Sequence, residues 1–182
     1  MKQYLRDNAK VVGGMFIALL ILGFLTYSFV APGGMFSGLQ NDLKAIETDA
    51  GVSYTDLDGV SVDLDELKGK PLIINSWATW MPFSKDELNL LAELKNSYGD
   101  RVEVVAMNRM EEVGTVRAYL ATYGIPETLR FLLDPADSFY KAVGGYAMPE
   151  TLFYRSDGTL FTHKRGVLTR EELEGYVGAL VE

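Results

Sequence analysis

The chain has 182 residues, enough for one domain with a sizeable core and an accessory segment. Its formal net charge is −8, and the acidic excess lies after residue 40, so no nucleic-acid partner is expected because polyanions would be repelled. It contains no cysteine and one histidine, His163. This composition excludes a thiolate nucleophile, a thiol redox centre, a cysteine metal site and a histidine cluster in this chain.

An uncharged, apolar run of 20 residues at 11–30 is long enough for a helix to span the ~30 Å hydrocarbon core of a bilayer. A cleaved signal peptide is the alternative, but its apolar region usually has only about 7–15 residues, and Pro32 disfavours cleavage here. Lys2, Arg6 and Lys10 precede the run, which predicts a cytoplasmic N-terminus. We therefore predict a single-pass cell-membrane protein whose C-terminal part is extracytoplasmic, with a cytoplasmic N-terminus at 1–10, a signal-anchor transmembrane helix at 11–30, a Gly-rich linker at 31–52 and a folded domain at 53–182.

Strand and helix patterns alternate in the first half of the predicted domain. Continuous apolar runs predict strands buried on both faces, and apolar residues every three or four positions predict helices. The predicted elements are a hairpin around Asp58-Gly59, a helical turn at 64–70, a strand at 71–78, a helix at 82–98, a strand at 101–108 and a helix at 112–124. This order implies a parallel βαβ unit.

The second half of the domain has a different pattern. A short strand at 129–134 and a short helix at 136–145 precede two strands within 150–166, joined at Asp157-Gly158, which is a strong hairpin signal. The last helix has Thr169 as its predicted N-cap and Glu172 as its capping-box partner. This order of elements resembles that of the thioredoxin fold, which has a βαβ half, a connecting helix, an antiparallel hairpin and a final helix.

Three stretches carry a specific resemblance. They are "DLDGVSVDLDELKGKPLIINSWATW" at 56–80, "AMPETLFYRSDGTL" at 147–160 and "GVLTREELEGYV" at 166–177. Together they resemble the membrane-anchored thioredoxin-like disulfide reductases of the TlpA/ResA type. The resemblance implies an α/β, thioredoxin-like fold with a central mixed β-sheet flanked by helices, in other words a redoxin domain over residues 53–182.

The departure from that family lies in its catalytic motif. Where the family has W-C-x-x-C, this chain has Trp80-Met81-Pro82-Phe83-Ser84. Thiol–disulfide exchange needs one thiol to attack and a second to resolve, and neither Met81 nor Ser84 forms a disulfide. Disulfide exchange is therefore excluded by composition, the turn is interpreted as a degenerate active site, and no cofactor is expected.

Other parts of the family's site are retained. Pro149 matches the cis-proline of the family, whose loop lies beside the motif and pairs an extended substrate with the backbone of the preceding residue, here Met148. Two interpretations stay open: a retained peptide groove, or a proline that only shapes its turn. Trp80 and Phe83 likewise either form an apolar binding patch or shield the helix end. The predicted binding surface comprises Trp80, Met81, Pro82, Phe83, Met148 and Pro149.

Four residues near the motif have predicted structural roles. Glu87 matches the carboxylate that tunes the thiols of the family, but here Ser84 and Glu87 have the S-x-x-E spacing of a capping box. Asn75 stands where classical thioredoxins keep a buried acid, and an amide cannot shuttle a proton. Trp77 is predicted to lie in the core.

Three functions follow as hypotheses. The first is binding of an extended peptide or an extracytoplasmic partner protein; the second is membership of the thiol-disulfide oxidoreductase lineage with a non-thiol activity; the third is a structural subunit of a membrane complex. A minor alternative is Cu(I) binding by the thioethers of Met81 and Met148, since soft sulfur ligands suit this ion. Against it, methionines at apolar positions are usually packing residues.

Overall fold

The computed structural model describes residues 53–182. The predicted N-terminus at 1–10, the transmembrane helix at 11–30 and the linker at 31–52 lie outside the described residues, and they stay predictions. Among the helices within 53–182, none is long and apolar enough to cross a bilayer.

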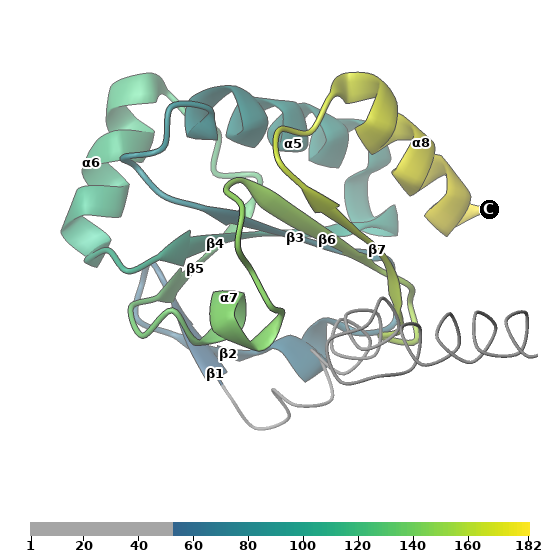
Figure 1. Cartoon of the computed structure of the whole chain (residues 1–182), viewed down its shortest axis with the longest axis horizontal. Helices are drawn as coiled ribbons and strands as arrows, with labels where there is room; N and C mark the ends of the chain where they lie inside the picture. Colours follow the sequence, from purple (N-terminus) through teal and green to yellow (C-terminus); the bar gives the residue numbers. More distant parts are fainter. Residues whose placement is uncertain (1–52) are drawn as a thin grey trace, which may run out of the picture. The chain divides into compact units, whose positions relative to one another are not determined.

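The described residues form a seven-stranded mixed sheet in the order β2-β1-β5-β4-β3-β6-β7 (Figure 1). Strands β3, β4 and β5 are parallel to one another, whereas every other pairing is antiparallel. The strands are β1 (Ser53–Asp56), β2 (Ser61–Asp63), β3 (Leu72–Trp77), β4 (Glu103–Arg109), β5 (Arg130–Asp134), β6 (Glu150–Tyr154) and β7 (Leu160–Arg165).

Helices cover both faces of this sheet (Figure 1). One face packs against α5 (Ser84–Tyr98), α6 (Val113–Tyr123) and α8 (Arg170–Val181). The other face packs against the 3-10 helix η1 (Leu64–Leu67) and against α7 (Ser138–Ala142). A second 3-10 turn, η2 (Gly99–Arg101), follows α5.

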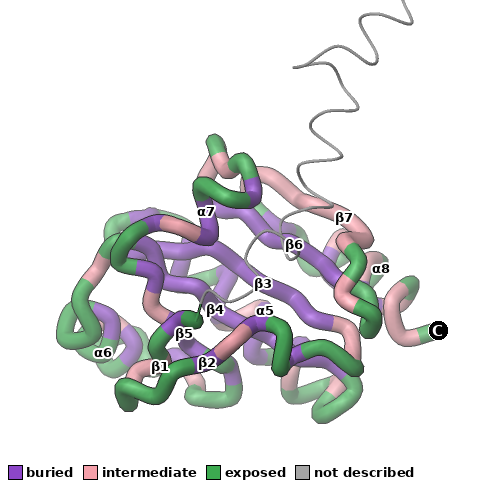
Figure 2. Tube along the Cα trace, turned by 90° about the horizontal axis from the view of Figure 1, so that it is seen from below, coloured by how far each residue is buried: buried purple, intermediate pink, exposed green. Residues whose placement is uncertain are grey.

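The central strands are buried because each supplies side chains to both cores. In β3, Ile73 belongs to the core under α5, and its neighbour Ile74 to the core over α7. Successive residues of a strand point to opposite faces, so a strand covered on both sides is buried along its whole length and mainly apolar. Figure 2 shows this burial along β3, β4 and β6, whereas the edge strand β7 is only half-buried.

The element order agrees with the predicted thioredoxin-like architecture. The hairpins at Asp58-Gly59 and Asp157-Gly158 are confirmed, as is the capping box of α8, in which Thr169 accepts from the Glu172 N–H. Two helix boundaries were wrong. The helix predicted at 82–98 begins at Ser84, and the one predicted at 136–145 ends at Ala142, because Gly144 turns with a positive φ of 68°.

Strand register brings four chain segments to one end of the sheet. Trp77 at the end of β3 pairs with Asn108 near the end of β4, and Ser76 pairs with Glu150 at the start of β6. Glu150 in turn pairs with Arg165, the last residue of β7. We call this end, where β3, β4 and β7 finish and β6 begins, the site end of the sheet.

Candidate functional site

The turn between β3 and α5 is closed by short-range hydrogen bonds. The Met81 N–H donates to the Ala78 carbonyl at 3.1 Å, and the Ser84 N–H donates to the Met81 carbonyl at 3.3 Å. The hydroxyl of Ser84 also donates to the Ala78 carbonyl, at 2.7 Å. The chain thus folds back tightly before α5 starts, which is why the helix begins at Ser84 rather than at Pro82.

The predicted capping box of Ser84 and Glu87 is wrong. Phe83 is the N-cap of α5 and makes no side-chain cap, while Ser84 lies inside the helix, fully buried, with its hydroxyl committed to Ala78. The Glu87 carboxylate points into the protein instead of back to the helix start. It accepts hydrogen bonds from Asn75 Nδ2 and from the Leu168 N–H, each at 3.0 Å.

Glu87 is therefore a buried carboxyl beneath the degenerate turn. Burial raises its pKa to about 7, although the hydrogen bonds from Asn75 and Leu168 and the nearby charge of Lys164 act in the opposite direction. Asn75 is buried as well and also donates to Thr151 Oγ1 on β6, at 2.9 Å. This chain of polar contacts joins β3, α5, β6 and the loop before α8.

A second carboxylate, that of Glu111, holds the start of the turn through Thr79. Glu111, two residues after β4, accepts from the Thr79 N–H at 2.8 Å and from the Thr79 hydroxyl. It accepts from Asn108 Nδ2 as well, at 2.8 Å. The sequence analysis missed Glu111. The available signal was topological, because parallel strands end at the same side of a sheet and place the residues after them together.

The cis-proline loop is organised around Glu150. The peptide bond between Met148 and Pro149 is cis. Glu150 is fully buried, and its Oε1 accepts from the N–H groups of Tyr146 and Ala147, both at 2.9 Å. Its Oε2 lies 2.8 Å from His163 Nε2. Burial disfavours the charged carboxylate, but these partners outweigh it and lower the pKa of Glu150.

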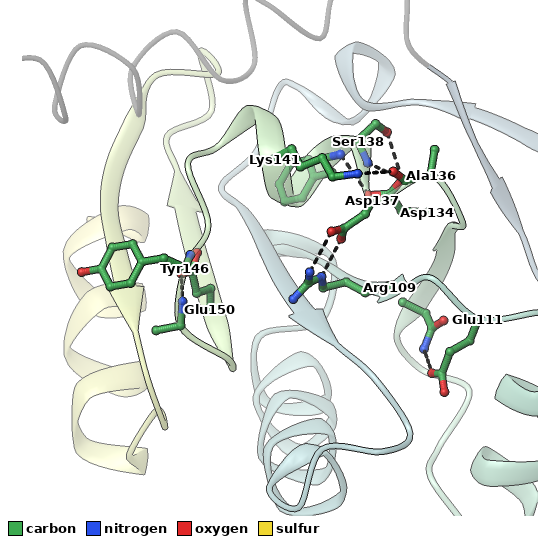
Figure 3. A network of polar contacts seen from close by, with 12 residues as sticks. Arg109, Glu111, Asp134, Ala136, Asp137, Ser138, Lys141, Tyr146 and Glu150 are labelled. Carbon is green, nitrogen blue, oxygen red and sulfur yellow. Dashed lines mark hydrogen bonds and ion pairs between the residues drawn. The ribbon is translucent and has the colours of Figure 1, made fainter. Parts of the chain in front are cut away.

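A buried ion pair lies behind this loop, at the end of β4 (Figure 3). Arg109 binds Asp137 through two parallel hydrogen bonds, Nε to Oδ1 at 2.6 Å and Nη2 to Oδ2 at 2.8 Å. Its guanidinium also stacks on the ring of Tyr140, 3.3 Å from the centroid. A Cβ at Gly145 would lie 2.5 Å from that ring, so only glycine fits where the loop crosses it. The sequence analysis missed this support too.

Apolar side chains gather at the surface of the site end. Trp80 is 61% exposed, Phe83 50% and Tyr146 77%, so the predicted exposure of Trp80 and Phe83 is confirmed. Within residues 53–182, six of the eight large apolar side chains that are exposed lie next to strand ends at the site end: Trp80, Phe83, Met110, Val113, Tyr146 and Val167. Trp77 is fully buried, as predicted.

The remaining predicted binding residues divide by burial. Pro82 is exposed and Met148 half-buried, so both contribute surface at the site end. Met81 is only 5% exposed and Pro149 is buried, so their side chains pack inward. No group of three or more histidine, aspartate or glutamate side chains within the described part of the chain is arranged to hold a metal ion.

A groove runs from the turn along α5. It has a volume of about 320 Å³ and lies between the first half of α5 and the loop from β7 to α8. Its lining combines apolar, acidic and basic side chains: Phe83, Asp86, Glu87, Asn89, Leu90, Glu93, Val167, Leu168 and Arg170.

Comparisons with known proteins agree with this architecture. The sequence pattern of the Redoxin family matches residues 41–180. Thiol-disulfide oxidoreductase ResA of Bacillus thuringiensis (strain Al Hakam) is 30% identical over 127 residues, which cover 68% of this chain and 70% of that protein. ResA of Bacillus subtilis (strain 168) is 24% identical over 169 residues, which cover 92% and 90%.

Solved structures show the same fold. A secreted Mycobacterium tuberculosis disulfide oxidoreductase, described as homologous to E. coli DsbE, superposes with a TM-score of 0.64 at 26% identity, covering 74% of this chain and 99% of that one. The sequence match extends over most of the chain, and the sheet order and the cis-proline loop occur in their expected places. The chain therefore belongs to the redoxin family and is a thioredoxin-like protein of the TlpA/ResA type.

Proposed function

We propose that this redoxin performs no thiol–disulfide exchange and instead binds an extended segment of an extracytoplasmic partner protein at the site end of its sheet. In this proposal residues 11–30 anchor the protein in the membrane. The observation that carries the proposal is the gathering of exposed apolar side chains around a turn and a loop that buried polar contacts hold in place.

The loss of redox chemistry follows from the two motif positions. Met81 has a thioether without an ionisable proton, and the Ser84 hydroxyl is buried and bound to a carbonyl. The chain contains no cysteine that could substitute for either. Since disulfide exchange requires two thiols, this turn lacks both groups that the reaction needs.

Binding is supported by what the site end exposes. Trp80, Phe83 and Tyr146 offer large, stiff apolar surfaces, which proteins use at interfaces because few rotatable bonds must be fixed. Met148 takes part in none of the backbone–backbone hydrogen bonds between residues 53 and 182, and in this proposal its backbone pairs with the extended strand of the partner. Hydrogen bonds hold the rim of the proposed site in this geometry, since Glu111 and Glu150 each accept from two donors of the adjoining loops.

Photo-crosslinking in the full-length, membrane-embedded protein tests the binding. A benzophenone amino acid at Phe83 is expected to give one discrete crosslinked product, whose yield falls when Trp80→Ser removes the neighbouring contact surface. The same probe at Val60, which is equally exposed on the β1–β2 hairpin, serves as the matched control. Identical products from both positions, or a Phe83 product unaffected by Trp80→Ser, contradict the proposal.

An insulin-reduction assay tests the redox part. The natural chain is expected to show no turnover, while the double variant Met81→Cys/Ser84→Cys restores the W-C-x-x-C motif and is the positive control for the scaffold. Turnover by the cysteine-free chain would overturn the proposed lack of thiol chemistry.

A further inference from the structure

The groove along α5 continues the proposed binding surface. Phe83 belongs both to the exposed turn and to the lining of the groove, and the exposed Val167 of the loop from β7 to α8 lines it as well. Leu90 and Leu168 add apolar lining farther along. A chain that contacts Trp80 and Phe83 in an extended conformation therefore has a path into this groove.

The charge of the groove is mainly negative. Asp86 and Glu93 lie two helical turns apart on α5 and both line the groove, as does the buried Glu87. One cation, Arg170, also lines it.

Arg170 already forms ion pairs with carboxylates of the protein itself. The Arg170 guanidinium lies 2.5 Å from the Glu93 carboxylate and 3.9 Å from that of Glu174. Lys164, whose positive charge lowers the pKa of Glu87, is paired with Glu172. Asp86 is exposed and has no salt-bridge partner in the part of the chain that the structure describes. The groove therefore presents one unpaired carboxylate and a second that is shared.

We propose that this groove receives a lysine or arginine side chain of the partner segment, next to an apolar side chain that contacts Phe83 and Val167. This inference rests on the proposed function and specifies its partner as an extended segment in which an apolar and a basic residue stand two positions apart. This spacing fits because successive side chains of an extended strand point to opposite sides, so that residues two positions apart face the same side. The overall net charge of −8 favours the encounter with such a cationic segment.

Synthetic peptides test the charge preference. Three fluorescent ten-residue peptides repeat the pattern Leu-Ser-Xaa-Ser, in which Xaa is lysine, serine or glutamate, so that leucine and Xaa share one side of the extended chain. The full-length protein is held in uncharged phosphatidylcholine nanodiscs so that the lipid does not attract the lysine peptide. At 20 mM salt the lysine peptide is expected to bind about tenfold more tightly than the serine peptide, and this ratio should fall below about twofold at 0.5 M salt.

Variants assign the preference to the groove. The double variant Asp86→Asn/Glu93→Gln is expected to remove most of the ratio between the lysine and serine peptides. Glu66→Gln, which removes an equally exposed carboxylate on η1 at the other face of the sheet, should leave it unchanged.

The outcomes separate the two proposals. If Phe83→Ser weakens binding of every peptide while the lysine and serine peptides bind equally, the inferred basic partner is wrong and the binding function stands. A glutamate peptide that binds as tightly as the lysine peptide likewise overturns the inference. If none of the peptides binds the natural chain, both the inference and the peptide-binding function are overturned.

Discussion

Asn75 and Glu87 are hydrogen-bonded in the interior, with Asn75 Nδ2 donating to Glu87 Oε2 at 3.0 Å. This contact joins the strand before the degenerate turn to the helix after it. Asn75 Oδ1 has no hydrogen-bond partner within residues 53–182. If the amide is turned by 180°, a protonated Glu87 can donate to that oxygen, and the orientation of an amide is an assignment based on its neighbours. A neutral Glu87 is therefore well accommodated at this position.

The first prediction concerns the pH dependence of stability. Glu87 is protonated in the folded chain up to a pKa of about 7, whereas the unfolded chain releases this proton near 4.5. Its contribution is fully present below pH 4.5 and is lost as the pH rises to about 7, because only the unfolded state gives up the proton in that window. We expect the free energy of unfolding to fall by up to about 3 kcal/mol between pH 4.5 and pH 7.5.

Urea unfolding at half-unit pH steps measures this slope. Glu87→Gln keeps the shape but cannot ionise, so its unfolding free energy should be nearly flat over the same window. Glu66→Gln is the control for loss of an exposed carboxyl and should retain the slope of the natural chain. An unchanged slope in Glu87→Gln would assign the effect to another group.

The second prediction separates the two roles considered for Ser84. At an N-cap, aspartate replaces serine at little cost, whereas at a buried position it introduces a charge without a partner. Because Ser84 is fully buried and donates to the Ala78 carbonyl, Ser84→Asp is expected to lose more than about 3 kcal/mol and Ser84→Ala about 1–2 kcal/mol.

Thermal and urea unfolding of both variants measure these losses. Thr169→Asp is the matched control at a true N-cap, and it should change stability by less than about 1 kcal/mol. A Ser84→Asp variant as stable as Thr169→Asp would show that Ser84 acts as a cap after all.

The sequence was sufficient where both the signal and the interacting partners are local. The strand β3 is mainly apolar and buried along its whole length, the hairpins carry Asp-Gly turns, and Thr169 and Glu172 stand three residues apart at the start of α8. Each of these patterns fixes its structure through neighbours in the chain. The same local rule misassigned Ser84 and Glu87, which have capping-box spacing but different partners.

The partners of these residues lie far away in sequence. Glu87 binds the Leu168 N–H, 81 residues later, and Asn75 binds Thr151, 76 residues later. Such pairs form only after the sheet has assembled, so no spacing rule identifies them. The pair of Glu150 and His163 was hidden for the same reason, since it depends on the register of β6 with β7.

The third prediction concerns the contact that holds the start of the turn. The Glu111 carboxylate accepts both the N–H and the hydroxyl of Thr79, and charged hydrogen bonds of this kind contribute about 1.5–3 kcal/mol. Thr79→Val and Glu111→Gln should each lower the unfolding free energy, and the double variant should lose less than the sum. We expect a coupling energy of about 1 kcal/mol from the double-mutant cycle.

A distant pair provides the comparison for this cycle. Glu111→Gln combined with Glu66→Gln should be additive within about 0.5 kcal/mol, since Glu66 lies on η1. Additivity of Thr79→Val and Glu111→Gln would mean that this contact does not stabilise the turn.

The fourth prediction concerns Glu150 and the cis-proline loop. The pKa of Glu150 is lowered because His163 and the N–H groups of Ala147 and Tyr146 stabilise its charge more than burial opposes it. A carboxyl with a lowered pKa in the folded state stabilises the fold above its unfolded pKa of 4.5, and this contribution is lost as the pH falls through the lower folded value. Glu150→Gln should thus be destabilised at pH 7, and the difference from the natural chain should shrink below pH 4.5.

Amide hydrogen exchange distinguishes a role in the loop from general stability. Glu150→Gln keeps an oxygen that can accept from the loop, whereas Glu150→Ala removes the acceptor of the Tyr146 and Ala147 N–H groups. Exchange at these two amides should therefore accelerate selectively in Glu150→Ala, under conditions where amides in the core of β3 remain protected. If all amides accelerate together, Glu150 stabilises the whole domain and does not specifically hold the loop; a selective change means that the carboxylate fixes the backbone on which Met148 would meet an extended partner.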